Sequence, residues 1–96
     1  MILEVALLDV LPDGTDEFEK AFAEASEIIS SARGYLSHEL QRCVEEPERY
    51  ILLGRWDTLE DHTEGFRGSA AYGEWKRLLH RFYDPLPTVE RFEPVG

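Results

Sequence analysis

The chain of 96 residues contains a single cysteine, Cys43, and no asparagine. One cysteine excludes an intrachain disulfide and any zinc site built from several cysteines. The three histidines, His38, His62 and His80, are scattered, and none has the His-x-His or Glu-x-x-His spacing that is typical of metal ligands. The sequence therefore predicts no metal site.

Basic side chains are also few, because 10 Lys and Arg residues stand against 20 Asp and Glu residues, giving a net charge of −10. Such a surface repels a phosphate backbone, and no cluster of Lys or Arg offsets it locally. We therefore expect no nucleic acid and no anionic membrane as a partner.

Long apolar runs are missing as well. The N-terminal segment MILEVALLDV has no basic region and is interrupted by Glu4 and Asp9, so it fits neither a signal peptide nor a membrane span, which needs about 18 apolar residues. Together with the lone cysteine, this predicts a cytoplasmic protein.

The apolar pattern that is present predicts four strands and three helices. The expected strands are apolar or alternating runs bounded by turn residues: 2–11, 35–44, 49–56 and 88–95. The expected helices have apolar residues at intervals of three and four. The first begins at Thr15 and stops at Gly34, the second follows a cap at Asp57 or Thr58, and the third follows a cap at Ser69.

This order predicts one α+β domain over residues 1–96, a ferredoxin-like four-stranded antiparallel sheet with its helices on one face. Strands 2–11 and 49–56 are apolar on both faces, yet two main helices can cover only one face of the sheet. The economical cover for the other face is a second copy of the chain, so we expect a homodimer through the open sheet face.

The stretch from Trp56 to Trp75 concentrates aromatic residues, a histidine, an arginine and three glycines. This stretch belongs to a longer pattern of residues: Tyr50-Ile51-Leu52-Leu53 leading to Trp56, then Glu60-x-His62, Phe66-Arg67-x-Ser69, Tyr72-x-x-Trp75, Leu78-Leu79 and Val89-Glu90-x-Phe92. In this order and spacing, the chain resembles the antibiotic biosynthesis monooxygenase (ABM) family, whose members fold as dimeric α+β barrels.

The resemblance implies a function. Characterised members oxidise electron-rich aromatic substrates such as anthrones or quinols with molecular oxygen, without a metal, flavin or other cofactor, in a pocket between the sheet and the helices. His62 is the candidate base, because histidine titrates near neutral pH. The remaining candidates are substrate-binding residues, in which aromatic side chains form the wall and an arginine supplies positive charge: Trp56, Phe66, Tyr72, Trp75, Arg55 and Arg67.

Each candidate also has a structural alternative. His62 shares a helical stripe with Leu59 and Phe66, which is equally typical of a packed, hydrogen-bonded histidine. His38, a further candidate for the pocket, points either at the helices or at the dimer interface. We expect His80 to face solvent. The apolar stripe of the last helix is typical of an ordinary core.

The absence of asparagine matters here, because some oxygen-inserting members use one in the pocket. The asparagine, tryptophan and haem-ligating histidine of the haem-degrading branch have no counterpart in this chain either. Two other functions therefore stay open beside monooxygenation. One is a module that binds or senses a small hydrophobic molecule without turnover, and the other is an oxygen-independent isomerase or cyclase.

Overall fold

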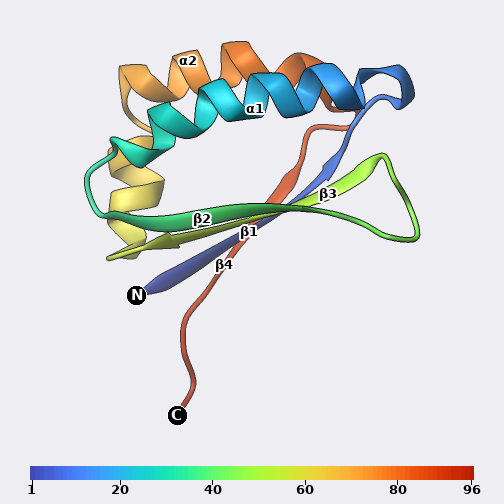
Figure 1. Ribbon diagram of the computed structural model, residues 1–96. Helices are drawn as coiled ribbons and strands as arrows, with labels where there is room; N and C mark the ends of the chain where they lie inside the picture. Colours follow the sequence, from blue (N-terminus) through green and yellow to red (C-terminus); the bar gives the residue numbers. More distant parts are fainter.

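Four antiparallel strands form one sheet in the computed structural model, which describes residues 1–96 (Figure 1). The strands are β1 (Ile2–Asp9), β2 (Tyr35–Arg42), β3 (Arg49–Trp56) and β4 (Thr88–Phe92), in the order β2-β3-β1-β4. This is the strand order of a ferredoxin-like sheet. The predicted fold class is confirmed.

Helices α1 (Thr15–Ser30) and α2 (Ala70–Leu79) lie side by side on one face of the sheet and leave the other face uncovered (Figure 1). Three short helices connect the main elements: η1 (Pro12–Gly14), η2 (Asp61–Phe66) and η3 (His80–Phe82). None of the helices is both long and apolar enough to span a membrane.

Several elements end earlier than the sequence predicts. Helix α1 stops at Ser30 rather than near Gly34, because Ser31 and Ala32 donate to carbonyls three residues back and so tighten the last turn. Gly34 has a φ of 78° and lies in the turn that leads into β2, so its left-handed conformation belongs to that turn.

A bulge changes the predicted faces of β2. Tyr35 pairs with Trp56 and Ser37 pairs with Arg55, so Leu36 is the extra residue and is 52 % exposed. The bulge brings the Tyr35 hydroxyl to 2.6 Å from His38 Nδ1. Strict alternation along the strand would put Leu36 and His38 on one face, and the bulge breaks this alternation.

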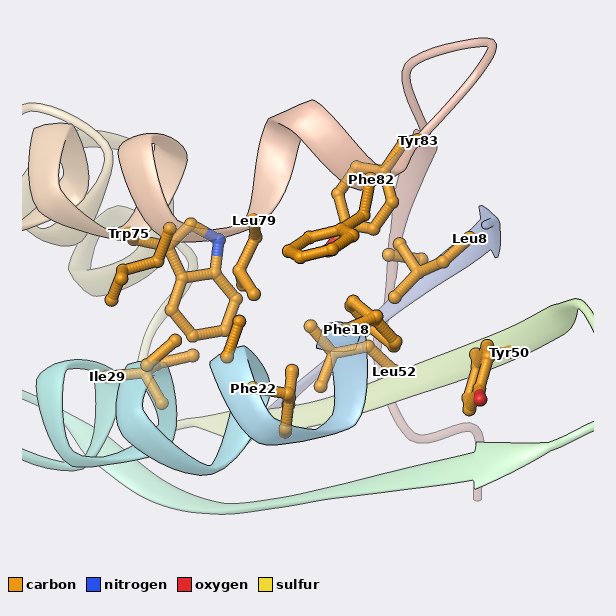
Figure 2. Close-up of a cluster of buried hydrophobic side chains, with 14 of the residues drawn as sticks. Leu8, Phe18, Phe22, Ile29, Tyr50, Leu52, Trp75, Leu79, Phe82 and Tyr83 are labelled. Carbon is orange, nitrogen blue, oxygen red and sulfur yellow. The ribbon is translucent and has the colours of Figure 1, made fainter. Parts of the chain in front are cut away.

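The core lies between the sheet and the two helices (Figure 2). Alternate residues of β1 and β3 face the helices, and Figure 2 shows Leu8, Tyr50 and Leu52 around Phe18 of α1. Phe18 is fully buried and its ring contacts four other aromatic rings: Phe22, Tyr50, Phe82 and Tyr83. Burial of large aromatic side chains is the main stabilising term for a domain of this size.

The other residues of β1 and β3 form what we call the open sheet face: Leu3, Val5, Leu7, Ile51 and Leu53. Cross-strand pairing places Val5 beside Leu53 and Leu7 beside Ile51. Leu7 is 52 % exposed. The chain therefore presents a continuous apolar strip that its own helices do not cover.

Candidate functional site

The site starts from Glu4, a carboxylate in the middle of β1 that shares the helix-facing side of the strand with Ala6. Glu4 is only 6 % exposed. It pairs across the sheet with Gly54 of β3, where an added Cβ would lie 2.9 Å from Glu4 Oε1. The missing side chain at Gly54 therefore leaves the room that the carboxylate occupies.

Two donors hold this carboxylate. The indole Nε1 of Trp56 donates to Glu4 Oε1 at 3.0 Å. The Nε2 atom of His62 lies 3.3 Å from the same oxygen, and the His62 side chain is 3 % exposed. A buried carboxylate is tolerated when it accepts hydrogen bonds of this kind.

His62 is positioned by η2, a π-helix with a wide turn. The helix is preceded by the predicted cap, in which Thr58 Oγ1 accepts from the backbone N–H of Asp61 at 3.1 Å. The wide turn closes when Arg67 N donates to His62 O at 3.0 Å. His62 and Phe66 then both stack near Trp56, with ring centroids 5.1 and 5.6 Å away.

The electrostatics favour an ionised Glu4. Burial disfavours the charged form, but hydrogen bonds from His62 and Trp56, the charge of a protonated His62 and the nearby charge of Arg67 outweigh it. Together they hold the pKa of Glu4 below its ordinary value of 4.5. An ionised carboxylate only accepts hydrogen bonds, so His62 carries its proton on Nε2.

In the neutral form of the ring, this tautomer leaves the lone pair of the imidazole on Nδ1. Nδ1 is buried and has no hydrogen-bond partner, and no other buried side-chain nitrogen or oxygen in the chain lacks one. Because buried polar atoms are nearly always paired, an orphaned imidazole nitrogen requires an explanation.

A cavity of about 140 Å³ lies between the sheet and the helices, and both Glu4 and His62 line it. Most of the lining is hydrophobic, including Ala6 of the sheet and Trp75 of α2. The exposed side chain of Arg67 also lines the cavity. The cavity therefore runs from the buried Glu4–His62 pair towards the surface at Arg67.

The structure brings most of the predicted site residues to this cavity: His62, Phe66, Arg67, Tyr72 and Trp75. The cap predicted at Ser69 places Tyr72 there, because Ser69 Oγ accepts from the backbone N–H of Tyr72 at 3.3 Å and starts α2. Trp75 is both a core residue and part of the wall.

Three predicted residues do not line the cavity. Trp56 is fully buried behind it and contacts three of its lining residues, Glu4, His62 and Phe66. Arg55 projects from the open sheet face, with its guanidinium 4.0 Å from the carboxylate of Glu39. His38 faces the helices, but beside Phe22 and Tyr35, at a ring-centroid distance of 5.8 Å from Phe22.

His80 and Glu4 line the cavity, although the sequence predicts neither as a site residue. His80 was expected in solvent, but it is half-buried and lines the cavity, where burial and the charges of Lys76 and Arg67 lower its pKa. Glu4 was treated only as an interruption of an apolar run. The sequence could have indicated its role, because Glu4 alternates with Ala6 and Leu8 along the strand, and this spacing places its charge on the same face as those apolar residues.

No three His, Cys, Asp or Glu side chains of the chain come together in a way that could hold a metal ion. The polar side chains that line the cavity offer an imidazole, a carboxylate, phenols and a guanidinium.

Comparison with known proteins gives three findings. The family model described as antibiotic biosynthesis monooxygenase matches residues 1–78. The uncharacterized protein YczJ of Bacillus subtilis (strain 168) is 56 % identical over 95 residues, covering 99 % of this chain and all of YczJ. A crystal structure from Bordetella bronchiseptica that carries the same family name is 34 % identical, with a TM-score of 0.94 and coverage of 99 % of this chain and 97 % of that one.

A more distant structural match is SnoaB of Streptomyces nogalater, which is described as a cofactor-independent oxygenase. Its sequence identity is 17 % and its TM-score is 0.83, with coverage of 99 % of this chain and 93 % of SnoaB. At this identity, the match establishes a shared fold.

Proposed function

This chain belongs to the antibiotic biosynthesis monooxygenase family, and from that premise we propose that it oxidises a small aromatic or quinol substrate with molecular oxygen and without a cofactor. The observation that carries the proposal is the unpartnered Nδ1 of His62 in a residue that lines a mostly apolar cavity. A ligand hydroxyl is the partner that this atom lacks.

The first step is proton transfer from the substrate to His62. Nδ1 accepts the hydroxyl proton of a quinol, and the resulting imidazolium keeps its Nε2–H on the Glu4 carboxylate. Glu4 both orients the ring and stabilises the positive charge that forms, as a carboxylate does behind a catalytic histidine. The hydrophobic wall excludes water from the resulting anion.

The second step is attack of the electron-rich ring carbon on oxygen. The peroxide that forms takes the proton back from the imidazolium and then loses water, which leaves a hydroxylated quinone. One quinol and one O₂ give one hydroxyquinone and one water. All four electrons that reduce O₂ therefore come from the substrate, so no external reductant enters the balance.

Oxygen uptake tests the proposal. Metal-free protein is incubated with a panel of hydroquinones, catechols and anthrones. His62→Ala should lower the uptake rate by about 10²–10⁴-fold, the usual contribution of a general base. His38→Ala is the matched control, because His38 does not line the cavity, and it should leave the rate unchanged. Incorporation of one ¹⁸O atom from ¹⁸O₂ into the product identifies monooxygenation.

The absence of asparagine favours one second candidate, a module that binds the same ligand without turnover. Its signature is saturable binding of panel compounds together with oxygen uptake at the level of the protein-free blank. Uptake that His62→Ala does not change would refute the role of the histidine while leaving the oxidation itself in place.

We also propose that two copies associate through the open sheet face. The support is the uncovered apolar strip on β1 and β3, including the half-exposed Leu7. Light scattering at micromolar concentration should give twice the monomer mass of 11.1 kDa. Leu7→Lys places a charge on the strip, at its most exposed position on β1, and should give the monomer mass. A monomer mass for the unmodified chain contradicts the proposal.

A further inference from the structure

We propose that the ligand of this cavity is a single aromatic ring with a hydroxyl at one end and a carboxylate at the other. The hydroxyl meets Nδ1 of His62, and the carboxylate meets Arg67. The inference rests on the proposed function for the location of the site, and it adds the size and charge of the substrate.

The size follows from the cavity volume of about 140 Å³. An apolar protein cavity of about 150 Å³ holds one benzene molecule. A single six-membered ring therefore fits the cavity, which Phe66 and Trp75 line, without movement of the core, whereas the three fused rings of an anthrone do not.

The hydroxyl of the ligand is inferred from the Glu4–His62 pair at the buried end of the cavity. The Glu4 carboxylate holds the Nε2 proton of His62, so Nδ1 acts as an acceptor and needs a donor. A phenolic hydroxyl supplies that donor. A second carboxylate at this end would lie against Glu4 and be repelled, so the acidic group belongs at the other end.

The carboxylate of the ligand is inferred from the positive charge at the outer end of the cavity. Arg67 forms no ion pair in a chain with 20 acidic residues. Its contacts are the Tyr72 hydroxyl, 3.4 Å from Nη2, and the Tyr72 ring, whose centroid is 5.4 Å from Cζ. Lys76 Nζ lies 5.2 Å from the centroid of the same ring. Two cations thus flank Tyr72, a lining residue, and both act on His80 inside the cavity.

An unpaired guanidinium beside an apolar cavity is suited to a carboxylate, which it binds through two parallel hydrogen bonds. The opposite charges of the two ends also fix the direction in which the ring enters. The ligand class is a hydroxylated benzoate, and for oxidation a dihydroxybenzoate.

Binding of 4-hydroxybenzoate tests the inference without turnover, because this compound is not a quinol. Trp75 lines the cavity, so quenching of tryptophan fluorescence reports occupancy, and calorimetry gives the dissociation constant independently. We expect 4-hydroxybenzoate to bind about tenfold or more tightly than phenol, a difference of about 1.4 kcal/mol. We also expect it to bind more tightly than anthracene-2-carboxylate.

Variants distinguish a direct contact between Arg67 and the ligand carboxylate from a general effect of positive charge on the protein. Arg67→Gln should reduce the affinity for 4-hydroxybenzoate to that for phenol, and Arg67→Lys should restore part of the difference. Arg91→Gln removes an equal charge from an exposed position on β4 and should change neither affinity. Because Arg67 and Arg91 are both exposed, all three variants should fold.

Equal affinities for phenol and 4-hydroxybenzoate would refute the proposed contact between the ligand carboxylate and Arg67. Tighter binding of anthracene-2-carboxylate than of 4-hydroxybenzoate would refute the limit to a single ring. An equal loss in Arg67→Gln and Arg91→Gln would also refute the inference, because it would show a non-specific charge effect. Binding as expected, with no uptake of oxygen on 2,5-dihydroxybenzoate, would support the inference and count against the proposed oxidation.

Discussion

Strand β3 has a polar cluster at each end, and the two clusters differ in one respect. At the Tyr50 end, the hydroxyl donates to Glu19 at 2.6 Å and accepts from Arg42 at 2.7 Å. At the Trp56 end, Glu4 joins Trp56 and His62, but Nδ1 of His62 has no partner. The first cluster lies against packed rings, and the second lies beside a cavity.

The contrast shows which feature marks a candidate site. Burial and the hydrogen bond to Glu19 raise the pKa of Tyr50 to about 12, so its hydroxyl keeps the proton that it donates to Glu19. Perturbed ionisation accompanies both clusters and does not distinguish them. A residue that lines a cavity and has an unsatisfied buried atom is found only at the Trp56 end, and this combination favours a ligand site.

The largest effect on stability is expected from Phe18→Ala at the packed end. Phe18 is fully buried among four rings, so the free energy of unfolding should fall by about 3–5 kcal/mol. Urea denaturation followed by circular dichroism measures the loss. Leu36→Ala at the exposed bulge is the control and should cost far less. If Phe18→Ala does not fold, Phe18→Leu should still show a measurable loss. Equal losses for Phe18→Leu and Leu36→Ala would contradict tight packing at this end.

A larger side chain should change the stability of the fold differently in the two regions. Ala25 of α1 is fully buried and does not line the cavity, so Ala25→Val should overpack the core and destabilise the fold by about 1–3 kcal/mol. Ala6 lines the cavity, so Ala6→Val should cost less than that or stabilise the fold while weakening 4-hydroxybenzoate binding. Unfolding and binding curves for both variants check this. A larger loss of stability for Ala6→Val would show that the cavity is not free space.

A pair of glycines tests the room that Glu4 needs. A Cβ at Gly54 would lie 2.9 Å from Glu4 Oε1 and 3.3 Å from Trp56 Nε1, so Gly54→Ala should displace the carboxylate from its donors, reduce oxygen uptake at least tenfold and also lower the free energy of unfolding. Gly73 in α2 has no atom within 4 Å of an added Cβ. Gly73→Ala should therefore stabilise the helix by about 0.5–1 kcal/mol and leave uptake unchanged. Unimpaired uptake in Gly54→Ala would remove Glu4 from the mechanism.

The smallest effect concerns acid stability. The folded protein lowers the pKa of Glu4 below 4.5, so the ionised carboxylate contributes stability that is present above that value and is lost as the pH falls through the lowered pKa. Glu4→Gln removes this contribution. The free energy of unfolding should therefore depend less steeply on pH below about 4.5 in the variant. Identical slopes for both proteins would show that Glu4 is not stabilised in its charged form.

The sequence alone determined the elements and their order, because hydrophobic periodicity and caps such as Thr58 and Ser69 act locally. It also identified a stretch that supplies five of the 15 lining residues, since His62, Phe66, Arg67, Tyr72 and Trp75 follow one another from η2 to α2.

Only the tertiary structure decided how residues far apart in the chain meet. Glu4 and His62 are 58 positions apart (62 − 4), and they come together because β1 pairs with Gly54 of β3 and η2 returns over Trp56. The bulge at Leu36 and the inward position of His80 likewise depend on sheet register and helix packing. Local patterns report which face a residue prefers, whereas the partner of a buried charge depends on long-range pairing, which periodicity does not encode.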